Sequence, residues 1–240
     1  MSVTDTFISH LLELRNRLLK IVVGLVVCVI AFLPFSNGLY TWLAHPLLIH
    51  LPAGTKMIAT AVTTPFLVPM RVSTLLAIVV SLPYTLYQAW AFVAPGLYAH
   101  ERRFVGPLIV ASTLLFLAGM AFAYFAVFPV LFGFITASAP EGVAVMTDIG
   151  SYLDFVTTMF VSFGLAFEVP IAVVVLVRFN IVKMEMLKEA RPYVIVGAFI
   201  VGAILTPPDV ISQIMLALPL WFLYEAGVFA ARFVTPCENP

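Results

Sequence analysis

The chain has 240 residues, of which 62% are hydrophobic and 10% are charged, and its 12 Lys and Arg residues balance 12 Asp and Glu residues. A soluble domain carries about 25% charged residues, so this composition excludes an ordinary soluble fold. Zero net charge argues against a nucleic-acid partner, and two cysteines argue against a disulfide framework or a thiolate metal site.

Six apolar runs follow one another along the chain, separated by segments rich in proline, glycine and charge. Long apolar runs are typical of membrane-spanning helices. We therefore predict an all-α, multi-pass membrane protein with a single transmembrane domain in contact with lipid. The predicted spans cover residues 18–35, 72–93, 104–135, 152–177, 192–205 and 210–231, and residues 36–71 form the predicted outer cap.

Lysine and arginine are unevenly distributed between the predicted loops. With both termini on the inner side, ten of the 12 basic residues lie inside and only Lys56 and Arg71 lie outside. This bias follows the positive-inside rule, so both the N- and C-termini are predicted to face the cytoplasm.

Helix shape is expected to be irregular. Four prolines lie within or near the ends of spans, where each removes a backbone donor and bends or ends its helix: Pro83, Pro129, Pro170 and Pro219. A curved, concave wall of helices is therefore expected. The fifth run, residues 192–205, would be only about 21 Å long as a helix, against a hydrocarbon thickness of about 30 Å. We expect the bilayer to thin beside it.

The segment that precedes the first span is amphipathic. Leu11, Leu14 and Leu18 share one helical face, while Glu13 and Arg17 have the i,i+4 spacing of an ion pair. One interpretation is a helix at the inner interface that only steers topology. The other makes Glu13 part of a binding surface for a basic ligand.

Two further carboxylates have functional and structural interpretations. Glu101 follows the Pro95-Gly96 turn of the first inner loop, where it either pairs with a neighbouring arginine or binds a ligand. Glu168 is predicted near the bilayer midplane, where a charge costs about 2.5 to 3.5 kcal/mol, so we expect it to be protonated, paired or in a wet cavity. Its candidate companions are Thr206 and Gln213.

Asp209 follows two prolines at the start of the sixth span, so it either caps that helix or contacts a ligand. The sequence contains no nucleophile elbow, zinc-protease motif or phosphate loop, and no ligand cluster for a metal or cofactor. A hydrolase or ATPase is thereby disfavoured. The main rival interpretation is a proton-coupled small-molecule carrier that uses Glu168.

Four motifs, in order, resemble the TatC family, the core receptor of the twin-arginine protein translocase. They are HLLELRNRL at 10–18, FVAPGLYAHERR at 92–103, FEVP at 167–170 and LTPPDVISQ at 205–213. The resemblance implies a non-enzymatic receptor in the bacterial cytoplasmic membrane. Such a receptor binds folded precursors through paired-arginine signal peptides, and export is driven by the proton-motive force.

The resemblance also implies site residues and partners. Glu13 and Glu101 correspond to the twin-arginine site, and Arg15 and Phe92 belong to the same surface. Carboxylates suit this role because guanidinium binds carboxylate in a planar, bidentate geometry that lysine does not reproduce. The implied partners are TatA and TatB, single-span proteins that dock by the fifth and sixth spans. A polar patch there would contain Glu168, Thr206 and Gln213.

Overall fold

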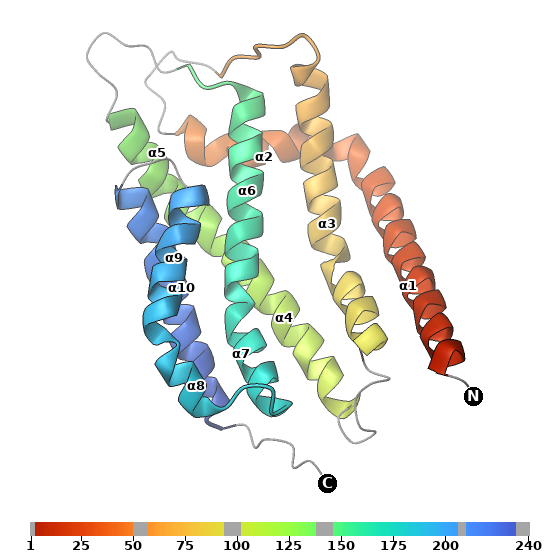
Figure 1. Ribbon diagram of the computed structural model, residues 1–240. Coiled ribbons are helices and arrows are strands. Elements are labelled where there is room, and N and C mark those ends of the chain that lie inside the picture. The colour runs from red at the N-terminus through yellow and green to blue at the C-terminus, as the bar shows by residue number, and fades with distance from the viewer. Residues whose placement is uncertain (1–2, 50–56, 94–101, 138–145, 206–209, 234–240) are drawn as a thin grey trace. The chain divides into compact units, whose positions relative to one another are not determined.

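The structure is a computed structural model, and it describes residues 3–49, 57–93, 102–137, 146–205 and 210–233 (Figure 1). Within these ranges the chain is helical apart from short connections, and the β-type pairing is an isolated parallel bridge between Ile58 and Asp148. The prediction of an all-α protein is confirmed for this part of the chain. The helices are α1 (Val3–Phe32), α2 (Ser36–Leu48), α3 (Thr64–Val93), α4 (Arg102–Phe122), α5 (Phe128–Ala137), α6 (Ile149–Phe167), α7 (Val169–Arg178), α8 (Met184–Glu189), α9 (Arg191–Leu205) and α10 (Val210–Ala231).

Five stretches of the described ranges are long and apolar enough to cross a membrane, which makes the chain a multi-pass membrane protein. They are Leu11–Leu48, Thr64–Ala89, Gly106–Ala137, Ile149–Arg178 and Gln213–Ala231. The predicted fifth span is also an apolar helix, Arg191–Ile204, but a shorter one. α9 as a whole has 15 residues, which corresponds to about 22 Å. Its predicted shortness is therefore confirmed, whereas a total of six spans stays a prediction.

The second span starts earlier than the sequence suggested. α3 begins at Thr64, inside the segment predicted as the outer cap. Pro65 does not delay this start, because the first turn of a helix has no intrahelical use for the N–H that proline lacks. α2 lies within the part of the predicted cap that precedes α3, and the role of this segment as an outer cap stays a prediction.

The helix widens for one turn between α4 and α5. This turn is a π-helix, Ala123–Val127, in which the N–H of Phe128 donates to the carbonyl of Ala123. Pro129 follows directly. In a regular α-helix the proline ring clashes with the carbonyl four residues earlier, and a widened turn relieves that clash. The irregularity predicted at Pro129 therefore takes the form of a π turn.

A second break separates α6 from α7 at Glu168. Pro170 occupies the first turn of α7, where its missing N–H is tolerated. The Glu168 N–H donates to the Leu165 carbonyl at 3.1 Å, and the Glu168 carbonyl accepts from the Ala172 N–H at 2.9 Å. The predicted effect of Pro170 on its helix is confirmed, and it places Glu168 at the break.

The chain divides into two compact units. The first comprises residues up to 45, 56–113 and 146–153, and the second comprises residues 46–55, 114–145 and 154–240. In the first unit α1 packs along α3, and the Ser73 hydroxyl donates to the Phe32 carbonyl at 3.3 Å. In the second unit α10 packs against α7 and α9. Buried residues of that second packing are Val173, Val177, Leu187, Tyr224, Val228 and Ala231.

Candidate functional site

A charged pair lies toward the N-terminal end of α1. Arg17 donates from Nη2 and Nε to the same carboxylate oxygen of Glu13, Oε1, at 2.6 and 3.0 Å. This salt bridge confirms the ion pair expected from the i,i+4 spacing. Arg17 also contacts α3, because its Nη1 donates to Oε1 of Gln88 at 3.4 Å. Gln88 is 5% exposed, so the charged pair is tied to a buried amide.

Phe92 lies near the C-terminal end of α3, as Gln88 does. It follows Gln88 by four residues, and residues four apart share one face of a helix. The Phe92 ring is half-buried. Two of the predicted site residues, Glu13 and Phe92, therefore belong to one end of the packed pair of α1 and α3.

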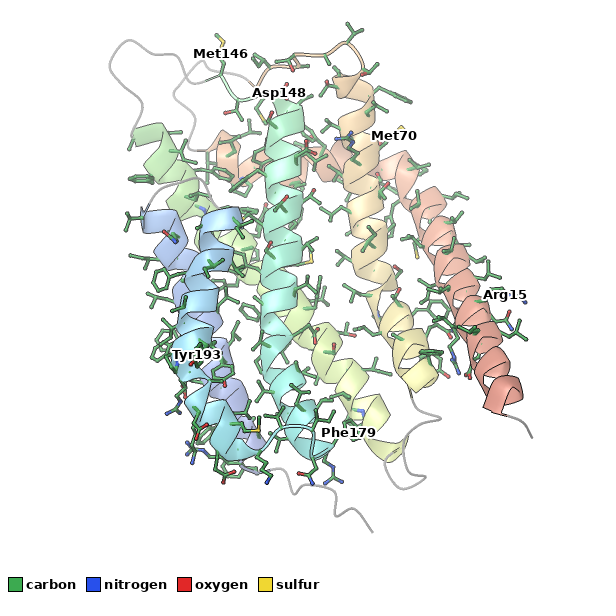
Figure 2. The ribbon with its side chains drawn as sticks, viewed as in Figure 1. Arg15, Met70, Met146, Asp148, Phe179 and Tyr193 are labelled. Carbon is green, nitrogen blue, oxygen red and sulfur yellow. The ribbon has the colours of Figure 1, made fainter. Side chains whose placement is uncertain are left out.

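Arg15 lies on a different side of α1. Residues two apart on a helix are separated by about 200° around its axis. Figure 2 shows Arg15 directed away from α3, and its Nη2 donates to Oδ1 of the adjacent Asn16 at 3.2 Å. The structure thus separates Arg15 from the face that carries Glu13 and Arg17.

Sequence reasoning missed the contribution of Gln88. The available signal was a glutamine within the apolar run 72–93, at the end of α3 near Phe92. Three other predicted residues, Glu101, Thr206 and Asp209, lie outside the described residues.

Gln213 contacts α9. Its side-chain Nε2 donates to the Phe199 carbonyl at 3.0 Å. The two helices approach closely at Gly202, where an added Cβ would lie 3.2 Å from the Gln213 Cγ and from the Gln213 carbonyl oxygen. The amide of Gln213 therefore lies at the junction of α9 and α10, the two helices predicted to bind a partner.

Glu168 does not share this location. Its neighbour Pro170 packs on α10 at Gly227, where an added Cβ would lie 2.8 Å from the Pro170 Cα. Gly227 and Gln213 are 14 positions apart on α10, which corresponds to about 21 Å along the helix. The structure therefore places the backbone beside Glu168 near Gly227 rather than near Gln213 and does not bring these two predicted residues together. Oε1 of Glu168 is buried.

A carboxylate also organises the start of α6. Oδ1 of Asp148 accepts from the backbone N–H and the hydroxyl of Thr60, both at 3.0 Å, and Oδ2 accepts from the N–H groups of Gly150 and Ser151, both at 3.0 Å. Figure 2 labels Asp148 at this end of α6. The backbone bonds from Ser151 and Thr60 are the main causes that lower the pKa of Asp148 from 3.8 to about 2. Asp148 thus caps α6 and holds the segment that contains Thr60.

We expect this cap to make stability depend on pH in the acid range. Because the pKa of Asp148 is lower in the folded state, the stabilisation is complete above about pH 4 and is lost as the pH falls toward 2. Thermal unfolding in detergent should show wild type melting above Asp148→Asn at pH 5, with the gap closing near pH 2. Thr60→Val keeps the backbone bond to Asp148 but loses the hydroxyl bond, so at pH 5 it should melt between wild type and Asp148→Asn. A gap between wild type and Asp148→Asn that is constant from pH 5 to 2 would contradict this role.

Comparison with known proteins places the chain in a family. The sequence profile of the Sec-independent protein translocase protein (TatC) family matches residues 9–219. A protein of that name from Escherichia coli (strain K12) is 52% identical over 235 residues, which is 97% of this chain and 91% of that protein. The corresponding protein from Haemophilus influenzae is 51% identical over 236 residues, covering 98% and 92% of the two chains.

Solved structures of the same family also match this chain. A crystal structure of the twin-arginine translocase receptor TatC matches with a TM-score of 0.80 at 35% identity, covering 93% of this chain and 98% of that chain. A second, of the receptor in DDM, matches with a TM-score of 0.81 at 34% identity. The multi-pass helical fold and these matches define a membrane-embedded protein-transport component. The chain belongs to the TatC family of Sec-independent protein translocase proteins.

Proposed function

We propose that this chain is the receptor and core subunit that binds paired-arginine signal peptides of folded precursors at the cytoplasmic membrane face. The proposal places it in the bacterial cytoplasmic membrane with six spans and both termini inside. It acts without catalysing a reaction, and the proton-motive force drives export. The observation that carries the proposal is the position of the Glu13 carboxylate. Arg17 binds this carboxylate and also binds Gln88, near the end of α3 that carries Phe92.

Two carboxylates account for a preference for two arginines. A guanidinium forms two parallel hydrogen bonds with one carboxylate, whereas an ammonium acts as a point charge. Glu13 would supply one carboxylate. Glu101 would supply the other, since it directly precedes α4 in the connection that follows Phe92 and α3. Arg15 would contribute from a different side of α1, the side directed away from α3 (Figure 2).

Binding of single-span partners, TatA and TatB, is assigned to α9 and α10. α9 is short for a membrane span, and the polar amide of Gln213 lies at its junction with α10. Thr206, in the connection between the two helices, would extend this polar docking position. A polar contact in lipid gives register to the docking and contributes about 0.6 to 2 kcal/mol. Asp209 either caps α10 or joins this contact, and Glu168 forms a separate polar position beside the α7–α10 packing.

Gln213→Leu should lower the yield of TatB that co-purifies with this chain several-fold, because the leucine removes the polar group. Binding of signal peptide should stay unchanged, since Gln213 is remote in sequence from α1 and α3. Gly202→Ala serves as the control for altered helix packing, because it crowds Gln213 without removing the amide. A normal TatB yield from Gln213→Leu would count against the docking position.

Solute transport by the chain alone distinguishes the receptor from a proton-coupled carrier. The carrier would use Glu168, whose Oε1 is buried, so vesicles holding only this chain would show saturable, proton-dependent solute flux. The receptor predicts no such flux. It predicts instead saturable binding of an Arg-Arg signal peptide to the purified chain and weak binding of the matched Lys-Lys peptide.

A further inference from the structure

We propose that Arg17, held by Gln88, is a positioning residue that fixes Glu13 by one oxygen and presents the other to the guanidinium of a signal peptide. The inference rests on the proposed function and assigns roles to two side chains, Arg17 and Gln88, that do not themselves bind the peptide.

The salt bridge between Arg17 and Glu13 is asymmetric. The two hydrogen bonds that Arg17 donates to Glu13, from Nη2 and Nε, both end on Oε1. Within the described part of the chain, no hydrogen bond is donated to Oε2 of Glu13. A carboxylate has about four lone-pair positions, two on each oxygen, so Oε2 keeps its capacity to accept from a second cation.

Arg17 is itself anchored by Gln88. Its third contact, from Nη1 to Oε1 of Gln88, links the guanidinium to a side chain that is 5% exposed and therefore restrained by its surroundings. The planar guanidinium holds its donors in a fixed fork. Fixing Gln88 therefore fixes Arg17, and fixing Arg17 fixes the Glu13 carboxylate. A carboxylate that is already ordered loses less conformational entropy when the peptide binds.

The positive charge of Arg17 could either support or oppose binding of the peptide. If the peptide guanidinium had to replace Arg17 on Glu13, Arg17 would be a competitor and its removal would strengthen binding. The bonds of Arg17 to a single oxygen favour the other arrangement, in which two guanidinium groups share one carboxylate. The positioning role and the competitor role therefore predict opposite signs for the same substitution.

The test is equilibrium binding of fluorescent Arg-Arg and Lys-Lys signal peptides to the purified full chain in detergent. Arg17→Gln should weaken Arg-Arg binding about tenfold, since it removes the charge-assisted bonds that orient Glu13. Gln88→Leu keeps the charge of Arg17, releases its anchor and should weaken binding about threefold. Lys20→Gln removes an equal charge three residues from Arg17 on the same helix, and Arg-Arg binding should stay at the wild-type value.

A double-mutant cycle separates positioning from general stability. In a Glu13→Gln background, Arg17→Gln should have no further effect on Arg-Arg binding, because its action passes through Glu13. The preference for Arg-Arg over Lys-Lys should fall in Arg17→Gln and recover in part in Arg17→Lys.

Three results would overturn the inference. Tighter binding of the Arg-Arg peptide to Arg17→Gln would show that Arg17 competes with the peptide for Glu13. Additive losses in the double-mutant cycle, with equal effects on both peptides, would show that Arg17 has a purely structural role. If Glu13→Gln itself bound Arg-Arg peptide normally, the assignment of Glu13 under the proposed function would fail, and the role of Arg17 with it. If Glu13→Gln weakened Arg-Arg binding but Arg17→Gln and Gln88→Leu did not, the positioning role of Arg17 would be rejected and the proposed function would stand.

Discussion

Gly119→Val should destabilise the protein by about 3 kcal/mol, because it overpacks a tight helix contact. Gly119 lies on α4, and an added Cβ would clash with the backbone carbonyl oxygen of Phe163 on α6. A backbone atom has no alternative rotamer, so one of the two helices must shift. Thermal or denaturant unfolding in detergent measures the loss.

The control for this substitution is Gly106→Ala. Gly106 lies on the same helix, and an added Cβ would meet nothing within 4 Å. Alanine is favoured over glycine inside a helix by about 0.5–1 kcal/mol, so this variant should be at least as stable as wild type. Equal stability of Gly119→Val and wild type would contradict the close approach of α4 and α6.

Loss of both proposed site carboxylates should weaken Arg-Arg signal-peptide binding about a hundredfold. Each of Glu13→Gln and Glu101→Gln removes a charge-assisted hydrogen-bonded pair, and such bonds contribute about 1.5–3 kcal/mol, or tenfold and more in affinity. Titration of a fluorescent peptide with the purified protein gives both single effects and the double effect.

Glu185→Gln is the matched control for the loss of a negative charge. Glu185 is an exposed residue in the first turn of α8 and has no assigned role in peptide binding. It should bind the Arg-Arg peptide as wild type does. A similar affinity for the double variant and Glu185→Gln would reject the carboxylate site.

Helix boundaries were predicted best where apolar runs ended at turn residues. α10 covers Val210–Ala231, the same residues as the predicted sixth span, and α9 starts one residue before the predicted fifth. α3 was predicted less well, because Thr64 starts a helix whose first turns contain Pro65 and Pro69. Proline is a clear break signal inside a helix but a compatible residue in its first turn.

The form of the irregularities could not be predicted. Pro129 and Pro170 both indicated a disturbed helix, yet one follows a π turn and the other follows a break at Glu168. The choice depends on packing with neighbouring helices, which a single sequence does not encode in a local pattern.

The candidate site was also predicted only where its residues are close together in the sequence. The i,i+4 spacing predicted the pair of Glu13 and Arg17, since both residues lie on one helix. Its contact with Gln88 joins two helices and depends on how α1 packs on α3. Likewise, Glu168 and Gln213 were placed together because depth was read from the ends of apolar runs. The structure instead places the backbone beside Glu168 near Gly227 rather than near Gln213.

The most direct test of the twin-arginine site compares the binding of Arg-Arg and Lys-Lys signal peptides to wild type and to Glu101→Ala by equilibrium fluorescence. Tight binding is expected only for the Arg-Arg peptide on wild type, because only that combination forms both bidentate guanidinium–carboxylate pairs. Equal affinities in all four combinations would contradict a twin-arginine site built on Glu101.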